Sequence, residues 1–92
     1  MFFSDITGPE NVKTPHGELY IINFIDDYSP KAWIYMIKRK SETHELFKDW
    51  RALVEREMSQ RIKIFQTDNG GEYSSKEFEA YLQKQGIQHQ VL

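Results

Sequence analysis

No cysteine occurs among the 92 residues, which excludes disulfide bonds and zinc sites built on thiolate ligands. The sequence also lacks an apolar run near the ~20 residues that a membrane-spanning helix needs. Its first residues have neither the basic start nor the apolar stretch of a signal peptide. We therefore expect an intracellular protein, in the nucleus or the cytoplasm, that makes no membrane contact.

A strong charge of either sign is absent as well. The 12 basic and 14 acidic side chains give a net charge of −2, whereas a domain that grips nucleic acid unaided usually carries a basic excess. This composition argues against tight autonomous DNA binding and leaves weak, metal-assisted or partner-assisted contact open. The apolar share of 39% and the aromatic share of 14% are typical of a folded protein, and residues 1–92 are expected to form one domain.

Strand-like and helix-like segments fill the sequence. Apolar, β-branched and aromatic runs predict five strands, at residues 1–7, 19–25, 32–37, 62–67 and 87–92. Gly8-Pro9 ends the first strand, residues 11–17 form a loop, and the second and third strands are expected to be buried on both faces. An amphipathic helix follows Ser41 as its N-cap. A second helix opens at the capping box Ser74–Glu77 and ends at Gly86.

These elements follow the order β-β-β-α-β-α-β. The second and third strands are joined by a short turn and form an antiparallel hairpin. The later alternation of strand and helix predicts parallel pairing with right-handed crossovers. The fold class is therefore α/β, with a mixed five-stranded sheet covered by helices.

Asp68 ends the fourth predicted strand and precedes Asn69-Gly70, a strong turn signal. One interpretation makes Asp68 the leading side chain of a tight turn, where aspartate is common. The other places it at the carboxyl end of a parallel strand, where the sites of open α/β sheets collect. Gly70 would then let a phosphate backbone approach closely. The residues alone leave both interpretations open.

Asp5 interrupts a strand of Phe and Ile, where an unpaired buried carboxylate is unfavourable. A lysine, an arginine, a backbone amide or a metal ion could satisfy it. If the first strand is central and lies beside the strand that ends at Asp68, the two carboxylates converge across one inter-strand spacing of about 4.8 Å. Such a pair raises its own pKa values until a cation arrives, and its hard oxygen ligands suit Mg²⁺ or Mn²⁺.

Several segments together resemble the integrase core of copia-type LTR retroelements, a branch of the retroviral integrase superfamily. They are Ser4–Pro9, Phe24–Ser29 with Trp33–Tyr35, Thr67–Tyr73 and Gly86–His89. They occur in the family order over nearly the whole chain, so their combination is specific although each segment alone is weak. The resemblance implies an RNase H-like fold, with Asp5 on the central first strand and Asp68 at the end of the fourth.

In that family the two aspartates begin a D,D-E triad that positions two Mg²⁺ ions for end processing and strand transfer of DNA. The resemblance therefore assigns Asp5 and Asp68 as catalytic and metal-binding residues. The third carboxylate, a glutamate on a helix after the fifth strand, has no counterpart before Leu92. Glu72 is the candidate that could reach the same ion. We expect a truncated core that binds Mg²⁺ or Mn²⁺ weakly and is inactive alone.

A basic cluster lies around the end of the third predicted strand. It is a candidate for contact with DNA phosphate, together with the turn after Asp68; the residues concerned are Lys38, Arg39, Lys40, Asn69 and Gly70. A solvated strand end explains the basic residues equally well. Asp26 and Asp27 are assigned to a turn at the opposite end of the sheet. The three histidines have no ligand spacing, so zinc is not expected.

Three functions remain open. The first is a metal-dependent polynucleotidyl transferase or nuclease, completed by missing sequence or by a partner. The second, which we favour, is an integrase core fragment that acts through self-assembly or a partner, because truncation leaves an apolar sheet face and a strand edge to be covered. This predicts a homodimer, including a domain-swapped one. The third is a weak DNA-binding module.

Overall fold

The computed structural model describes residues 1–14, 17–68 and 71–92, and it describes side chains outside 8–18 and 69–72. Its strands and main helices follow the predicted order, with two short 3-10 helices added. The strands are β1 (Phe2–Thr14), β2 (Gly17–Asp26), β3 (Ala32–Ile37), β4 (Ile64–Thr67) and β5 (Gln88–Val91). The helices are η1 (Lys40–Glu42), α1 (Thr43–Met58), η2 (Gly71–Ser74) and α2 (Lys76–Lys84).

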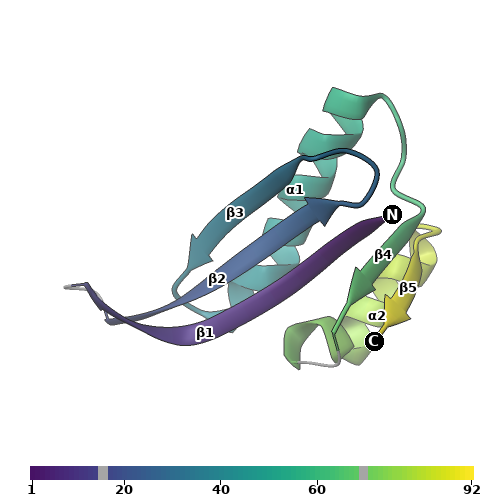
Figure 1. Ribbon diagram of the computed structural model, residues 1–92. Helices are drawn as coiled ribbons and strands as arrows, with labels where there is room; N and C mark the ends of the chain where they lie inside the picture. The colour runs from purple at the N-terminus through teal and green to yellow at the C-terminus, as the bar shows by residue number, and fades with distance from the viewer. Residues whose placement is uncertain (15–16, 69–70) are drawn as a thin grey trace.

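The strands form a mixed five-stranded sheet in the order β3-β2-β1-β4-β5 (Figure 1). β1 pairs antiparallel with β2 and parallel with β4, so it is the central strand. β3 pairs antiparallel with β2, and β5 pairs parallel with β4. The predicted mixed sheet, with an antiparallel and a parallel half, is confirmed.

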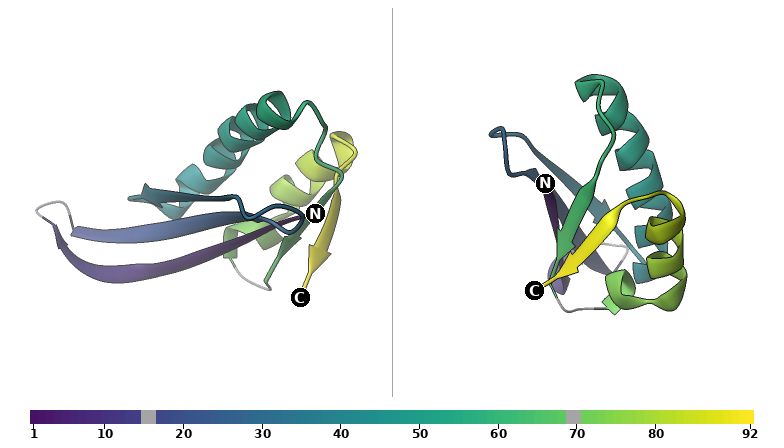
Figure 2. Two further views of the ribbon diagram at one scale, coloured as in Figure 1. Left: turned by 45° about the horizontal axis from the view of Figure 1, so that its top comes forward. Right: turned by 90° about the vertical axis from the view of Figure 1, so that its right-hand side faces the viewer.

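The first strand does not end at Gly8-Pro9, contrary to the prediction, because β1 continues to Thr14. Its ladder with β2 instead changes register between Thr7 and Glu10. A proline has no N–H for the ladder, and irregular pairing is where a sheet accommodates one. The predicted loop is therefore wrong for residues 11–14 and 17, and residues 15–16 lie outside the described ranges. The β1–β2 hairpin projects beyond the helices (Figure 2).

Both helices cover the same face of the sheet (Figure 2). Ile22 and Phe24 of β2 point toward them and are 0% exposed. Side chains alternate along a strand, so their neighbours point to the other side, where Ile25, Ile34 and Met36 are 46%, 69% and 68% exposed. The prediction that these two strands are buried on both faces is wrong. We call the side away from α1 and α2 the open face; its residues include Phe3, Asp5, Asn23, Ile25, Ile34 and Met36.

Aromatic rings form the centre of the core, between the sheet and the helices. The Phe24 ring stacks on Trp50 of α1 with centroids 4.1 Å apart. The ring centroid of Phe65 on β4 lies 4.7 Å from that of Phe47 on α1 and 6.3 Å from that of Phe78 on α2. Burial of a side chain of this size contributes about 1.5–3 kcal/mol. This packing holds β4 against both helices.

The helix boundaries differ slightly from the prediction. Residues 40–42 form η1, so α1 begins at Thr43 with Glu42 rather than Ser41 as its N-cap. The N-cap of α2 is Ser75, whose hydroxyl accepts the N–H of Phe78 at 3.1 Å. Gly86 has φ +74° and ends α2 as predicted. Among the described residues, no helix is long and apolar enough to cross a membrane.

Candidate metal centre

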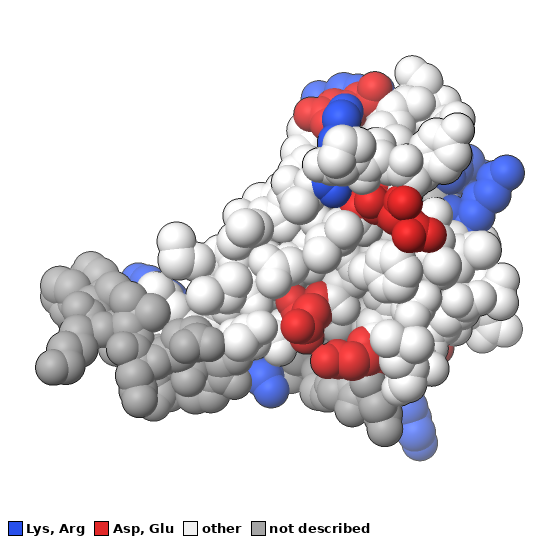
Figure 3. Space-filling model, viewed as in Figure 1, with Lys and Arg blue, Asp and Glu red and all other residues white. Residues whose placement is uncertain are grey.

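Asp5 and Asp68 come together because β1 and β4 run parallel in matched register. Ser4 of β1 is the ladder partner of Thr67 of β4, and each aspartate follows one of these two residues. Both aspartates are exposed. Acidic side chains gather over β1 and the end of β4 on an otherwise largely uncharged face (Figure 3). The predicted pair is therefore formed across the two strands.

The electrostatics of Asp5 reflect this proximity. Partial desolvation raises the pKa of Asp5, and a hydrogen bond with Asp68 and the negative charge of Asp68 raise it further, against the lowering effect of the Ile6 amide. Two adjacent carboxyl groups resist simultaneous ionisation unless a proton or a cation lies between them. The donor set thus fits a hard divalent cation such as Mg²⁺ or Mn²⁺.

The reason given for Asp5 from the sequence was burial among Phe and Ile, and that reason is wrong. Alternation turns Phe2 and Ser4 toward the helices and leaves Asp5 on the open face, exposed. In the antiparallel ladder its partner across β2 is Asn23. Its carboxyl group is hydrogen-bonded to that of Asp68, so it is not an unpaired buried charge.

The residues before the two aspartates, Ser4 and Thr67, each form a side-chain hydrogen bond on the helix-covered side of the sheet. Ser4 Oγ lies 2.7 Å from the hydroxyl oxygen of Tyr73, in a buried hydrogen bond. Thr67 Oγ1 lies 2.8 Å from Nε2 of His89. Burial raises the pKa of Tyr73 against the lowering effect of the Ser4 hydrogen bond, and the charges of Asp5 and Asp68 raise it further. The Tyr73 hydroxyl therefore interacts electrostatically with both carboxylates.

Tyr73 and His89 were missed as site residues in the sequence. Tyr73 is 1% exposed and His89 has a side chain that is 3% exposed. Both belong to segments that carry the family resemblance, Thr67–Tyr73 and Gly86–His89. A polar side chain inside a segment that carries the resemblance was the available signal, but neither residue has metal-ligand spacing in the sequence.

The third acidic ligand is not found among the described side chains. No three His, Asp or Glu side chains gather within the part of the chain that the structure describes. The candidate ligand Glu72 has no described side chain, and Asn69 and Gly70 lie outside the described residues. Their predicted roles stay predictions.

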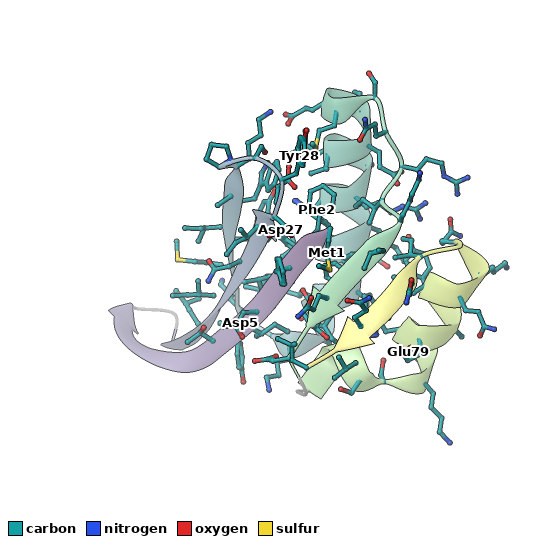
Figure 4. All side chains as sticks on the ribbon, turned by 45° about the vertical axis from the view of Figure 1, so that its right-hand side comes forward. Met1, Phe2, Asp5, Asp27, Tyr28 and Glu79 are labelled. Carbon is teal, nitrogen blue, oxygen red and sulfur yellow. The ribbon has the colours of Figure 1, made fainter. Side chains whose placement is uncertain are left out.

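Asp26 and Asp27 lie away from this site, as predicted. Asp26 pairs across the ladder with Phe2, and Asp27 lies beside Met1, far along β1 from Asp5 (Figure 4). The Asp26 carboxylate accepts the Tyr28 N–H at 3.0 Å and the Ser29 hydroxyl at 2.7 Å. Burial opposes its ionised form, but these bonds outweigh burial and lower the pKa of Asp26. Its role is to build the turn.

The basic cluster lies at the end of edge strand β3, and β2 separates it from β1. The Glu42 carboxylate accepts the backbone N–H groups of Lys38 and Arg39, each at 2.9 Å. The Lys40 amine lies 5.7 Å from the centre of the Tyr20 ring. These contacts give the segment a local structural role, and its contact with DNA stays a prediction.

Comparison with known proteins places the chain in a family. The integrase core domain model matches residues 1–92. The Pol polyprotein from transposon TNT 1-94 of Nicotiana tabacum is 42% identical over 90 residues, which are 98% of this chain and 7% of that protein. The Pol polyprotein from transposon RE1 of Arabidopsis thaliana is 31% identical over 87 residues, 95% of this chain and 6% of that protein. The chain thus spans a small part of these relatives.

Solved integrase structures have the same fold. The HTLV-2 integrase catalytic core domain in complex with magnesium, in its dimeric form, matches with a TM-score of 0.72 at 20% identity, over 98% of this chain and 57% of that chain. Its trimeric form matches with a TM-score of 0.74 at 19% identity, over 99% and 57%. The RNase H-like sheet is therefore confirmed. Together with the retrotransposon relatives, this makes the chain a member of the integrase core domain family, of the copia type.

Proposed function

We propose that Asp5 and Asp68 hold a divalent cation, Mg²⁺ or Mn²⁺, and supply two of the acidic ligands of a DNA strand-transfer site. The adjacency of the two carboxyl groups carries this proposal, because it raises the pKa of Asp5 in a way that a bound cation would relieve. Family membership supports it, as does the magnesium named with the HTLV-2 core of similar fold.

A cation held there would supply Lewis-acid activation of an attacking oxygen and stabilisation of a leaving oxygen. The residues of this chain have a narrower task. Asp5 and Asp68 provide ionised oxygens at one point of the open face, and the hydrogen bonds of Ser4 and Thr67 beneath them restrict their movement. Preorganisation of this kind reduces the reorganisation needed when charge develops.

We further propose that the 92 residues alone do not catalyse strand transfer or cleavage. Two carboxylates hold one ion weakly, and two-metal chemistry needs further ligands. Those ligands would come from outside the described side chains, from Glu72 or from another segment or partner. The polypeptide would then contribute to DNA integration as part of a larger assembly.

Titration with Mn²⁺, followed by isothermal calorimetry or by water-proton relaxation, tests the metal site. The unsubstituted chain should bind, and Asp5→Asn and Asp68→Asn should each abolish binding. Asp27→Asn changes an exposed acid beside Met1 that is not part of the pair; it is the matched control and should bind normally. Glu72→Gln should weaken binding if Glu72 is a ligand. Equal binding by the unsubstituted chain and Asp68→Asn would remove the basis of the proposal.

A supercoiled-plasmid assay with Mn²⁺ tests the expected inactivity separately. We expect the unsubstituted chain to nick no more plasmid than Asp68→Asn does. Nicking by the unsubstituted chain alone would show that the described pair acts within a complete site, which contradicts the inactivity but supports the metal ligands. Nicking by both proteins would indicate a contaminating nuclease.

The open face favours a second proposal, self-association of the chain. Ile34 and Met36 expose about two thirds of their surfaces, at 69% and 68%, and adjoin Ile25 at 46%. Exposed apolar patches of this kind mark association surfaces. We propose a homodimer, formed face to face or by exchange of strands. Sedimentation should give a dimer at micromolar concentration that Ile34→Lys dissociates, whereas Gln88→Lys, an exposed β5 residue, should not. A stable monomer would contradict this proposal.

A further inference from the structure

A chain of polar contacts leads from the surface of α2 to the residue before Asp68. Nδ1 of His89 on β5 is hydrogen-bonded to Oε1 of Glu79 on α2, and Figure 4 shows where Glu79 lies on that helix. Nε2 of the same ring lies 2.8 Å from Thr67 Oγ1, at the end of β4. The imidazole thus connects three elements, and the last of them carries Asp68.

The carboxylate of Glu79 determines how the ring is protonated. An ionised carboxylate only accepts hydrogen bonds, so Nδ1 of His89 carries a hydrogen and donates it to Glu79. In the neutral ring Nε2 is then an acceptor, and the Thr67 hydroxyl donates to it. With a neutral ring the hydrogen bonds run from Thr67 through His89 to Glu79, and they give the Thr67 hydroxyl a partner.

Packing holds the imidazole in place. Its side chain is 3% exposed, while that of Glu79 is 48% exposed. The ring stacks on Phe65 with centroids 6.1 Å apart and meets Phe78 edge-on at 6.0 Å. A ring fixed by two aromatic neighbours and by a hydrogen bond at each nitrogen has little freedom to move, and it transmits that rigidity to Thr67.

Thr67 is also held through its backbone. Its carbonyl oxygen accepts the N–H of Leu92 at 2.9 Å, and it pairs with Ser4 in the ladder of β1 and β4. Thr67 itself is 1% exposed. The end of β4 is therefore anchored on both sides, by β1 and by β5, and the His89 hydrogen bond holds its side chain as well.

We propose that His89 is a positioning residue, which holds the end of β4 through the Thr67 hydroxyl so that Asp68 stays beside Asp5. An effect of His89 on metal binding rests on the function proposed above. Its effect on the distance between Asp5 and Asp68 does not, because that distance is a property of the chain without a metal. Supporting partners of this kind typically change metal affinity by about 10–100-fold when they are lost.

The geometry can be measured without a metal, because the chain has no cysteine. The double substitution Asp5→Cys/Asp68→Cys introduces one pair of thiols, whose rate of disulfide formation in a glutathione buffer reports how often the two positions meet. Adding His89→Phe keeps the ring stacking and removes both hydrogen bonds. We expect cross-linking to slow, because the Thr67 hydroxyl loses its hydrogen-bond partner. Val54→Ala, a buried α1 substitution away from this chain of contacts, is the control for lost stability.

Substitutions at Thr67 test the route of the effect. Thr67→Val has nearly the same shape without the hydroxyl and should slow cross-linking as much as His89→Phe does, while Thr67→Ser should restore the normal rate. In the Thr67→Val background, His89→Phe should have no further effect, because both changes break the same contact. Additive effects of the two substitutions would overturn the proposed route.

Mn²⁺ titration of His89→Phe in the chain with both aspartates completes the test, and we expect affinity to fall about tenfold. Unchanged cross-linking in His89→Phe, or equal slowing in His89→Phe and Val54→Ala, overturns the positioning role. If the unsubstituted chain binds no Mn²⁺, the proposed function fails, and the cross-linking rates alone still decide the role of His89. Selective slowing with Mn²⁺ binding supports both.

Discussion

Asp5 on β1 lies beside Asp68, the residue that follows β4, and each aspartate comes directly after a buried hydroxyl-bearing residue, Ser4 or Thr67. The two hydroxyl groups point to the helix-covered side, where that of Ser4 is hydrogen-bonded to Tyr73 and that of Thr67 to His89. The acidic pair and its supports are thus on opposite faces of the same two strands. The supporting side chains can therefore be substituted without replacing either carboxylate, and the effect on the pair can then be measured.

Asp68→Asn should lower the pKa of Asp5. Partial desolvation raises that pKa first, and the hydrogen bond and charge of Asp68 raise it further. The substitution removes the charge and leaves the desolvation. Carboxyl-carbon NMR chemical shifts, recorded against pH, measure the change, and Asp27→Asn is the control. An Asp5 pKa that stays the same in Asp68→Asn would mean that the two carboxyl groups do not interact.

The free energy of unfolding should depend on pH in the direction set by the raised pKa of Asp5. Because folding raises the pKa of Asp5, the folded chain keeps this proton to higher pH than the unfolded chain does. Asp5 therefore contributes stability below its ordinary pKa of 3.8, and that contribution is lost as pH rises through the raised pKa. Asp68→Asn should weaken this loss. Urea unfolding from acid pH to neutrality measures it, against the same control.

Asp26 should contribute with the opposite sign. Its pKa is lowered in the folded state, so its contribution is present above 3.8 and is lost as pH falls through the lowered pKa. Asp26→Ala leaves the Tyr28 N–H and the Ser29 hydroxyl without this acceptor. We expect a loss of about 1–3 kcal/mol in the free energy of unfolding near neutral pH.

Asp27 provides the comparison for Asp26, because it is the adjacent aspartate and is exposed. Asp27→Ala should change the free energy of unfolding by less than about 0.5 kcal/mol. A similar loss in the two variants would indicate that the charge of the turn matters and that the individual Asp26 hydrogen bonds do not.

Tyr73→Phe should reduce stability by about 1–2 kcal/mol, because it leaves the buried Ser4 hydroxyl without its partner at 2.7 Å. Ser4→Ala should have a similar effect on Tyr73. The double variant should lose less than the sum of the two, since the unsatisfied partner is removed as well. Chemical denaturation of all four proteins measures the coupling. A coupling energy of zero would mean that the bond contributes nothing to folding.

Gly86→Ala should destabilise the end of α2 through backbone strain alone. Gly86 has φ +74°, and a methyl group placed there would meet no atom within 4 Å. The left-handed conformation is unfavourable for alanine by about 1–2 kcal/mol. Gly86→Asn should lose less, because asparagine tolerates this region. Thermal unfolding of the two variants gives the order, and equal losses would point to a packing defect.

The order of elements was predictable, because long apolar runs and helical periodicity depend on local sequence. The central place of β1 was implied by the family resemblance and not by local pattern. The burial of β2 and β3 was not. Their apolar residues are nearly continuous, and the sequence does not say on which side the helices pack. Ile22 and Ile34 look alike in the sequence, yet one is buried and the other is 69% exposed.

The acidic pair was predictable from Asp5 and Asp68 and the family pattern, but its environment was not. Whether Asp5 is buried depends on the direction in which its side chain leaves β1, and a shift of one residue reverses that direction. His89 was passed over for a similar reason. Its contacts join residues that are 10 and 22 positions away, and no local spacing reveals them.

The open face has a consequence for regulation. Asp5 shares a row of ladder partners with Asn23 and Ile34, so the acidic and the apolar residues belong to one continuous surface. A partner that covers Ile34 in the proposed dimer would lie close to Asp5 and limit the water around it. Under the two proposals above, cation binding and association are thermodynamically linked, and each changes the affinity of the other by the same factor. The metal affinity of this chain should therefore depend on its own concentration.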